Sequence, residues 1–188
     1  MDEIEPEVKK EKRGRETLFR ATYQSQNNLI QVADNKANMI ISINTMIISS
    51  IIAITGYGAV ADKLAEFNIW MLLPLSLIVL SCMLSAILAI QAAKPMLIKP
   101  WTSDNNKDKS SLLFFGRIAS YSQEAYLKEI KNLLNSGSDL YEHMAIDLHN
   151  QGRILTRKYN LLVYAYQVFM FGFVLSVVAF LIFLAIMK

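Results

Sequence analysis

The sequence predicts an all-α integral membrane protein. We expect three transmembrane helices and a small cytosolic helical bundle that is continuous with the first and third spans. The chain of 188 residues is 53% hydrophobic and only 19% charged, whereas soluble domains carry about a quarter charged residues. Three long stretches contain no Asp, Glu, Lys or Arg. The segments between them show helical spacing of apolar residues and no alternation typical of strands.

The three uncharged stretches are residues 37–61, 67–93 and 159–187. A bilayer core about 30 Å thick needs roughly 20 apolar residues in a helix, and each stretch is longer than that. A charged side chain at the centre of such a helix costs about 2.5–3.5 kcal/mol, so the absence of charge is itself a signature. Three buried helices of a soluble core would leave too little chain to cover them. Each stretch is therefore predicted to be a transmembrane helix.

The segment before the first span has two parts. Residues 1–15 are charged, mixed in sign and nearly free of large apolar groups, which predicts a disordered tail. From Glu16 the apolar residues take helical spacing, and no Gly or Pro interrupts the chain before Gly56. This predicts a cytosolic helix over 16–36 that continues into the first span. The segment lacks a signal-peptide core with a cleavage site, so we expect that span to be retained.

A cytosolic helical region is predicted over 94–158. It opens with two prolines that stop the preceding helix, and a polar loop follows. Ser122 is placed to cap a helix that runs to about Asn135, and Gly137 is expected to end that helix in the C′ position. A further amphipathic helix then leads into the third span.

The basic residues are concentrated in two segments. Seven of the 19 Lys and Arg lie in residues 1–36 and ten in 94–158, whereas the hairpin 62–66 and the C-terminus carry one each. Basic loops stay in the cytosol. With three spans, this places the N-terminus in the cytosol and the C-terminus outside.

The first span carries a polar face. Four polar residues follow one another at steps of four, three and four, which places them on one side of a helix: Asn38, Ser42, Thr45 and Ser49. Such groups avoid lipid, so this face is expected to contact protein or water. Two interpretations stay open: helix–helix hydrogen bonding, or a pore or gate surface with these four as pore-lining candidates. Asn44 lies off this face.

Small residues recur at helical spacing in the other two spans. The second span has Ser81, Ser85 and Ala89 at four-residue steps, and the third has Gly172 and Ser176. Small residues let helices approach closely in a membrane. The pattern favours tight packing, either within one chain or between subunits.

Charged residues gather at the cytosolic mouth of the spans. Asp34 and Lys36 lie at the start of the first span. The possible partners of Asp34 at the same depth on the third span are Arg153, Arg157 and Lys158. One interpretation is a structural ion pair beside a snorkelling Lys36. The other is an anion or nucleotide site, in which cations hold a phosphate and Phe114 or Phe115 stacks on a base.

The sequence offers no constellation for catalysis. It lacks the G-x-S-x-G, Walker A, H-E-x-x-H and G-x-G-x-x-G patterns. His143 and His149 are not spaced as metal ligands on a helix, and the lone Cys82 lies inside the second span as a small apolar residue. A net charge of +3 does not indicate nucleic-acid binding. We therefore expect no enzyme, no metal, no cofactor and no nucleic-acid partner.

Three segments, in this order, resemble a known family. The stretch 33–44, Ala-Asp-Asn-Lys-Ala followed by Asn-Met-Ile-Ile-Ser-Ile-Asn, is similar to the start of the first span in the Pycsar transmembrane effectors, the PycTM family. The Leu-Leu-Phe-Phe-Gly run at 112–116 resembles their cytosolic motif, and residues 139–159 resemble the helix before the last span. The resemblance covers about 18–185. Arg117 departs from it, since a neutral residue such as Asn commonly follows the motif.

The resemblance implies a bacterial anti-phage effector of the inner membrane. In such systems a cyclase senses infection and makes cyclic CMP or cyclic UMP, and the effector then impairs the membrane and stops the infected cell. It implies a cyclic pyrimidine nucleotide as activating ligand and a functional link to the cyclase, and we expect a homo-oligomer in the lipid bilayer. The candidates for nucleotide sensing or coupling are Asp34, Lys36, Phe114, Phe115, Arg117 and Lys158. The alternative is a membrane scaffold or anchor whose cytosolic helices dock a protein partner.

Overall fold

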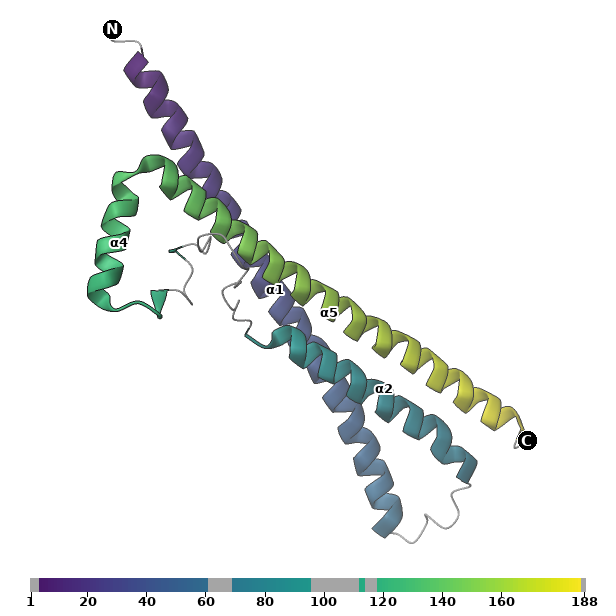
Figure 1. Ribbon diagram of the computed structural model, residues 1–188. Helices are drawn as coiled ribbons and strands as arrows, with labels where there is room; N and C mark the ends of the chain where they lie inside the picture. Colours follow the sequence, from purple (N-terminus) through teal and green to yellow (C-terminus); the bar gives the residue numbers. More distant parts are fainter. Residues whose placement is uncertain (1–3, 61–68, 96–111, 114–117, 187–188) are drawn as a thin grey trace, which may run out of the picture. The chain divides into compact units, whose positions relative to one another are not determined.

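The computed structural model describes residues 4–60, 69–95, 112–113 and 118–186 (Figure 1). The described residues form the helices α1 (Ile4–Val60), α2 (Ile69–Ala93), α4 (Gln123–Asn135) and α5 (Gly137–Ile186), and no strand. Three of these helices are long and apolar enough to cross a membrane: α1, α2 and α5. The predicted all-α fold with three spanning helices is therefore confirmed.

The chain divides into two compact units. The polar unit comprises residues 1–30 and 95–156, and the apolar unit comprises 31–94 and 157–188. Helices α1 and α5 supply residues to both units, whereas α2 belongs to the apolar unit and α4 to the polar unit. Each of the two long helices therefore has one part in the polar unit and one part in the apolar unit.

The beginning of α1 differs from the expectation. A disordered tail was expected for residues 1–15, but α1 begins at Ile4. The segment is rich in Glu, Lys and Arg, which are good helix formers, and Pro6 falls in the first turn, where its missing N–H is tolerated. Mixed charge therefore does not prevent helix formation when a long helix follows without a break.

Helix α4 begins as predicted and ends differently. The side chain of Ser122 caps its N-terminus, with Oγ accepting a hydrogen bond from the N–H of Ala125 at 3.3 Å. At the other end Ser136 is the cap, and its N–H donates to the carbonyl of Leu133 at 3.2 Å. Gly137 follows this cap at the predicted C′ position, but it is not left-handed and is also the first residue of α5. The chain turns directly into the next helix, so it needs no left-handed glycine.

Small side chains form the core of the apolar unit. The buried cluster takes residues from all three of its helices: Ala37, Ile40, Ala89, Ala92, Leu162 and Ala165. Four of these six are alanines, which let helix backbones approach closely. The small residues singled out in the second span, Ser81, Ser85 and Ala89, are all buried. Their pattern therefore serves packing within one chain.

Helices α2 and α5 approach each other closely at Gly172. A Cβ placed on Gly172 would meet the side chain of Ser81, within 2.5 Å of its Oγ. Real Cβ atoms essentially never come so near another heavy atom. Only glycine fits at this position of α5, because α2 occupies the space that any side chain would need.

Contacts within the polar unit join the charged part of α1 to the first turns of α5. The rings of Phe19 and Tyr141 are stacked with centroids 5.7 Å apart. The backbone N–H of Leu112 donates to Nδ1 of His143 at 3.2 Å, and the Leu112 side chain is buried. The first contact joins α1 to α5 across more than a hundred positions of the sequence, and the second fixes Leu112 beside the start of α5.

Candidate functional site

The predicted ion pair at the mouth of the first span is present. Nζ of Lys158 on α5 donates to Oδ1 of Asp34 on α1. The Lys158 side chain is only 6% exposed, whereas that of Asp34 is 39% exposed. Burying an ammonium without a partner is costly, so the carboxylate is what allows Lys158 to lie inside. The pair holds α1 against α5 within the apolar unit.

Lys36 lies on the exposed side of α1, two residues after Asp34. Its carbonyl oxygen accepts a hydrogen bond from the hydroxyl of Tyr166 at 3.3 Å. Its side chain borders a cavity of about 570 Å³ that is otherwise lined by residues of α5, most of them apolar. Lys36 is thus a cation at the edge of an apolar surface, as a snorkelling lysine would be.

Three of the predicted sensing residues, Phe114, Phe115 and Arg117, lie outside the described residues. Their neighbours Leu112 and Leu113 are described. Both belong to the polar unit, where Leu113 borders the cavity described next.

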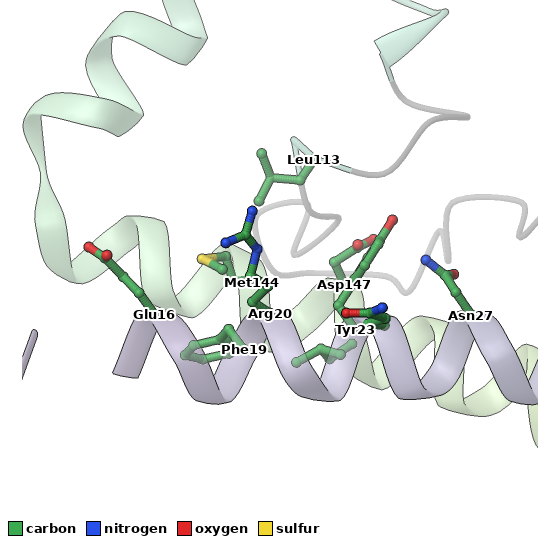
Figure 2. Close-up of a pocket in the computed structure, with 10 residues that line it drawn as sticks. Glu16, Phe19, Arg20, Tyr23, Asn27, Leu113, Met144 and Asp147 are labelled. Carbon is green, nitrogen blue, oxygen red and sulfur yellow. The ribbon is translucent and has the colours of Figure 1, made fainter. Parts of the chain in front are cut away.

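A cavity of about 560 Å³ opens in the polar unit between α1 and α5 (Figure 2). Helix α1 contributes Glu16, Phe19, Arg20, Tyr23, Gln24 and Asn27. The remaining lining residues are Leu113, Met144, Asp147 and Leu148. Small-molecule sites in proteins have volumes of about 300–1,000 Å³ and combine apolar walls with a few polar groups. This cavity has the size and the composition of such a site.

The polar groups of the cavity are of different kinds. Figure 2 shows the side chains of Arg20, Tyr23 and Asp147 projecting to the side on which Leu113 lies. Asp147 is 6% exposed, and its buried Oδ1 has no hydrogen-bond partner among the described residues. Burial raises the pKa of the Asp147 carboxyl, because removal from water disfavours the charged form. A guanidinium, aromatic rings and an unpaired acceptor together suit a planar polar molecule that carries an anionic group.

Sequence reasoning missed this cavity. It interpreted residues 16–36 as a helix leading into the membrane and residues 139–159 as the helix before the last span. A signal was present, because Phe19, Tyr23 and Asn27 recur at four-residue steps and so lie on one face of α1. A face that mixes aromatic and polar side chains differs from the apolar stripe of a packing helix.

The polar face of the first span lies on the outside of the chain. The four pore-lining candidates, Asn38, Ser42, Thr45 and Ser49, are all exposed. The Ser42 hydroxyl donates to the carbonyl of Asn38 at 2.9 Å, and that of Thr45 donates to Ile41 at 2.8 Å. These hydroxyls therefore bond within α1 rather than to α2 or α5. The face is free to meet lipid or a second copy of the chain.

Asn44, which the sequence places off this face, joins the three helices instead. Its Nδ2 donates to Oγ of Ser85 on α2 at 3.0 Å, and that Oγ donates to the carbonyl of Ala165 on α5 at 2.8 Å. Asn44 and Ser85 are both fully buried. This three-helix polar chain fixes the register of α1, α2 and α5, since a shift of any one helix breaks a bond in apolar surroundings.

Replacing Ser85 with Ala is expected to remove both bonds of the three-helix polar chain. Hydrogen bonds between membrane helices contribute about 0.6 kcal/mol on average and up to about 1.7 kcal/mol. We expect a loss near the upper value, because the amide of Asn44 is left buried without an acceptor. Thermal unfolding of the protein in detergent measures the loss. The matched control is Ser76→Ala on the same helix, whose exposed hydroxyl donates only to Leu73 at 2.9 Å. Equal melting temperatures for the two variants would contradict the prediction.

The fold and the cavity define a small membrane protein with three spanning helices and a ligand-sized site in a polar helical unit. The family model of the Pycsar effector protein domain, PycTM, matches residues 18–185. The chain belongs to this family, and it is a membrane-associated Pycsar effector of anti-phage defence, an effector rather than a known enzyme. No curated protein and no solved structure matches the chain.

Proposed function

We propose that the chain senses a cyclic pyrimidine nucleotide, cyclic CMP or cyclic UMP, and responds by impairing the integrity of the bacterial inner membrane. The nucleotide is the product of the cyclase in the same defence system, and the damage stops the infected cell before the phage multiplies. The observation that supports this most is the cavity of about 560 Å³ on α1 and α5. These two helices also supply two of the three candidate spans.

The cavity offers a group for each part of such a ligand. The Arg20 guanidinium suits the cyclic phosphate, and the ring of Phe19 or Tyr23 suits the face of the base. Three proposed sensing residues follow Leu113 directly or closely in the sequence: Phe114, Phe115 and Arg117. We propose that these three residues also take part in sensing the nucleotide, with the Arg117 guanidinium as a further cation suited to the phosphate.

The response requires two states of the protein. A ligand shifts an equilibrium only if it binds the two states unequally. Helices α1 and α5 line the cavity, and the same two helices carry the Asp34–Lys158 ion pair. We assign this pair and Lys36 a coupling role, in which ligand binding changes how α1 and α5 pack along their length.

The proposed orientation has the polar unit and the N-terminus in the cytosol and the C-terminus outside. The two basic segments support it, because positive loops remain on the cytosolic side. We propose a homo-oligomer in which the exposed polar face at Asn38, Ser42, Thr45 and Ser49 meets another subunit. In the activated state this face lines a path for water and ions.

The test is dye release from liposomes that contain the purified chain. We expect cyclic CMP or cyclic UMP, added on both sides of the bilayer, to release trapped carboxyfluorescein, whereas buffer does not. Arg20→Ala is expected to raise the half-activating concentration about tenfold or more, because a bond to a charged group contributes about 1.5–3 kcal/mol. The matched control is Arg13→Ala, an exposed arginine on the same helix that does not line the cavity. An absence of release with both nucleotides would remove the proposal.

One observation favours the scaffold function as a second candidate. Leu127 and Leu134 of α4 are 46% and 61% exposed, although α4 spaces its apolar residues for packing. Exposed leucines on a short amphipathic helix suit contact with a protein partner. A chain whose melting temperature is unchanged by any cyclic nucleotide, and which co-purifies with one stable partner, would identify the scaffold.

A further inference from the structure

We propose that the Asp147 carboxylate accepts a hydrogen bond from an exocyclic amino group on the ligand. This chain then binds the cytosine nucleotide in preference to the uracil nucleotide. The inference rests on the proposed function, which leaves open which of the two is sensed. It concerns the carboxylate of Asp147, which lines the cavity of the polar unit, and the hydrogen bond that its Oδ1 atom lacks.

The Oδ1 atom of Asp147 is buried and has no hydrogen-bond partner among the described residues. The residue lines the cavity and is 6% exposed. Buried polar atoms are nearly always hydrogen-bonded, and an exception calls for a reason. An ionised carboxylate only accepts hydrogen bonds, so a donor on the ligand completes this site and stabilises the charged form against the effect of burial.

The other polar side chains of the cavity do not supply that donor to Oδ1. Arg20 and Tyr23 also line the cavity, and Figure 2 shows their polar ends projecting to the same side as the carboxylate. Neither side chain donates a hydrogen bond to Oδ1 of Asp147. The guanidinium of Arg20 is therefore suited to bind a phosphate, whereas the carboxylate of Asp147 is suited to bind a hydrogen-bond donor on another part of the ligand.

The two candidate bases differ at the edge that a carboxylate would meet. Cytosine presents an exocyclic amino group, which is the group that Asp and Glu accept from in base recognition. Uracil presents a carbonyl oxygen at that position, and its single ring N–H lies between two carbonyl oxygens that repel a carboxylate. An acceptor at this place thus favours cytosine and disfavours uracil.

The experiment compares the two nucleotides on the full chain in detergent by titration calorimetry. We expect cyclic CMP to bind about tenfold more tightly than cyclic UMP, the scale of a well-formed contact to a base edge. In Asp147→Asn the preference is expected to vanish or reverse, because an amide both donates and accepts. The matched control is Glu142→Gln, an exposed carboxylate on the same helix outside the cavity, and we expect it to keep the preference.

A structural role for Asp147 predicts a different result. If the carboxylate only supported the fold, Asp147→Asn would lower the melting temperature. If Asp147 is a ligand-binding group without a partner in the free protein, Asp147→Asn is expected to be at least as stable as the original chain when no nucleotide is present. The reason is that burying an amide costs less free energy than burying a charge.

The outcomes separate the inference from the proposal beneath it. Equal affinity for the two nucleotides, or a preference that survives Asp147→Asn, would overturn the inference while leaving cyclic nucleotide sensing intact. Binding of neither nucleotide would overturn both.

Discussion

Gly172→Ala is expected to push α5 away from α2 and to destabilise the apolar unit by about 2–3 kcal/mol, at the upper end of the usual range for overpacking. The added Cβ would fall on the side chain of Ser81, within 2.5 Å of its Oγ. The Cβ of Ser81 is fixed to the α2 backbone and cannot move aside by rotation. The two helices have to separate, and the three-helix polar chain of Asn44, Ser85 and Ala165 is strained with them.

Thermal unfolding in detergent measures the effect of Gly172→Ala, and two further variants make the result specific. Gly56→Ala adds the same methyl group to α1, where a Cβ meets nothing within 4 Å. It is expected to be neutral or slightly stabilising, because Ala favours helix. Ser81→Gly in the Gly172→Ala background removes the obstructing side chain and is expected to restore most of the lost stability. If Gly172→Ala melted like Gly56→Ala, the close contact of α2 and α5 would be wrong.

The spans and several local features could be predicted because each depends on a rule that acts within a short window. Absence of charge over about 20 residues identifies a spanning helix. Ser122 indicates the start of a helix because its side chain accepts a hydrogen bond from the backbone N–H three residues ahead. An ion pair of Asp34 was predicted because cations lie at the same depth on the third span, but the sequence left Arg153, Arg157 and Lys158 as alternatives and the structure selects Lys158.

The role of Asn44 shows where periodicity fails. Helical spacing sorts residues into faces, but it does not say which face meets a neighbour. The regular polar face of the first span proved to be exposed, whereas the single asparagine off that face is the one that hydrogen-bonds across helices. The partner that decided this, Ser85, comes 41 residues later in the sequence.

The cavity of the polar unit was beyond sequence reasoning for a similar reason. It depends on Tyr23 and Asp147 coming together from opposite ends of the chain. The mixed aromatic and polar face of α1 is visible in the sequence, but the segment that faces it is not. Only the pairing of α1 with α5 turns an exposed aromatic face and a buried carboxylate into one site.

Lys158→Met is expected to have the second large effect, because it leaves Asp34 without its cation. Removing one partner of a fully buried pair costs about 3–5 kcal/mol. The Asp34 side chain is 39% exposed, so water compensates part of the lost interaction and we expect a loss of about 2 kcal/mol. The matched control is Arg157→Met, a neighbouring exposed cation on the same helix, which is expected to change the melting temperature little.

A double-mutant cycle separates the ion pair from the packing of the lysine chain. Asp34→Asn, Lys158→Met and the double variant are compared by thermal unfolding in detergent. Interacting residues give an effect in the double variant smaller than the sum of the single effects, and we expect the double variant to be more stable than Lys158→Met alone, because no unpaired carboxylate remains. Strict additivity would show that the pair carries no energy. The same variants also test coupling. If the pair links the cavity to the spans, breaking it shifts the nucleotide concentration that releases dye from liposomes, and the Kd for the nucleotide shifts in the same direction, since coupling between sites is reciprocal.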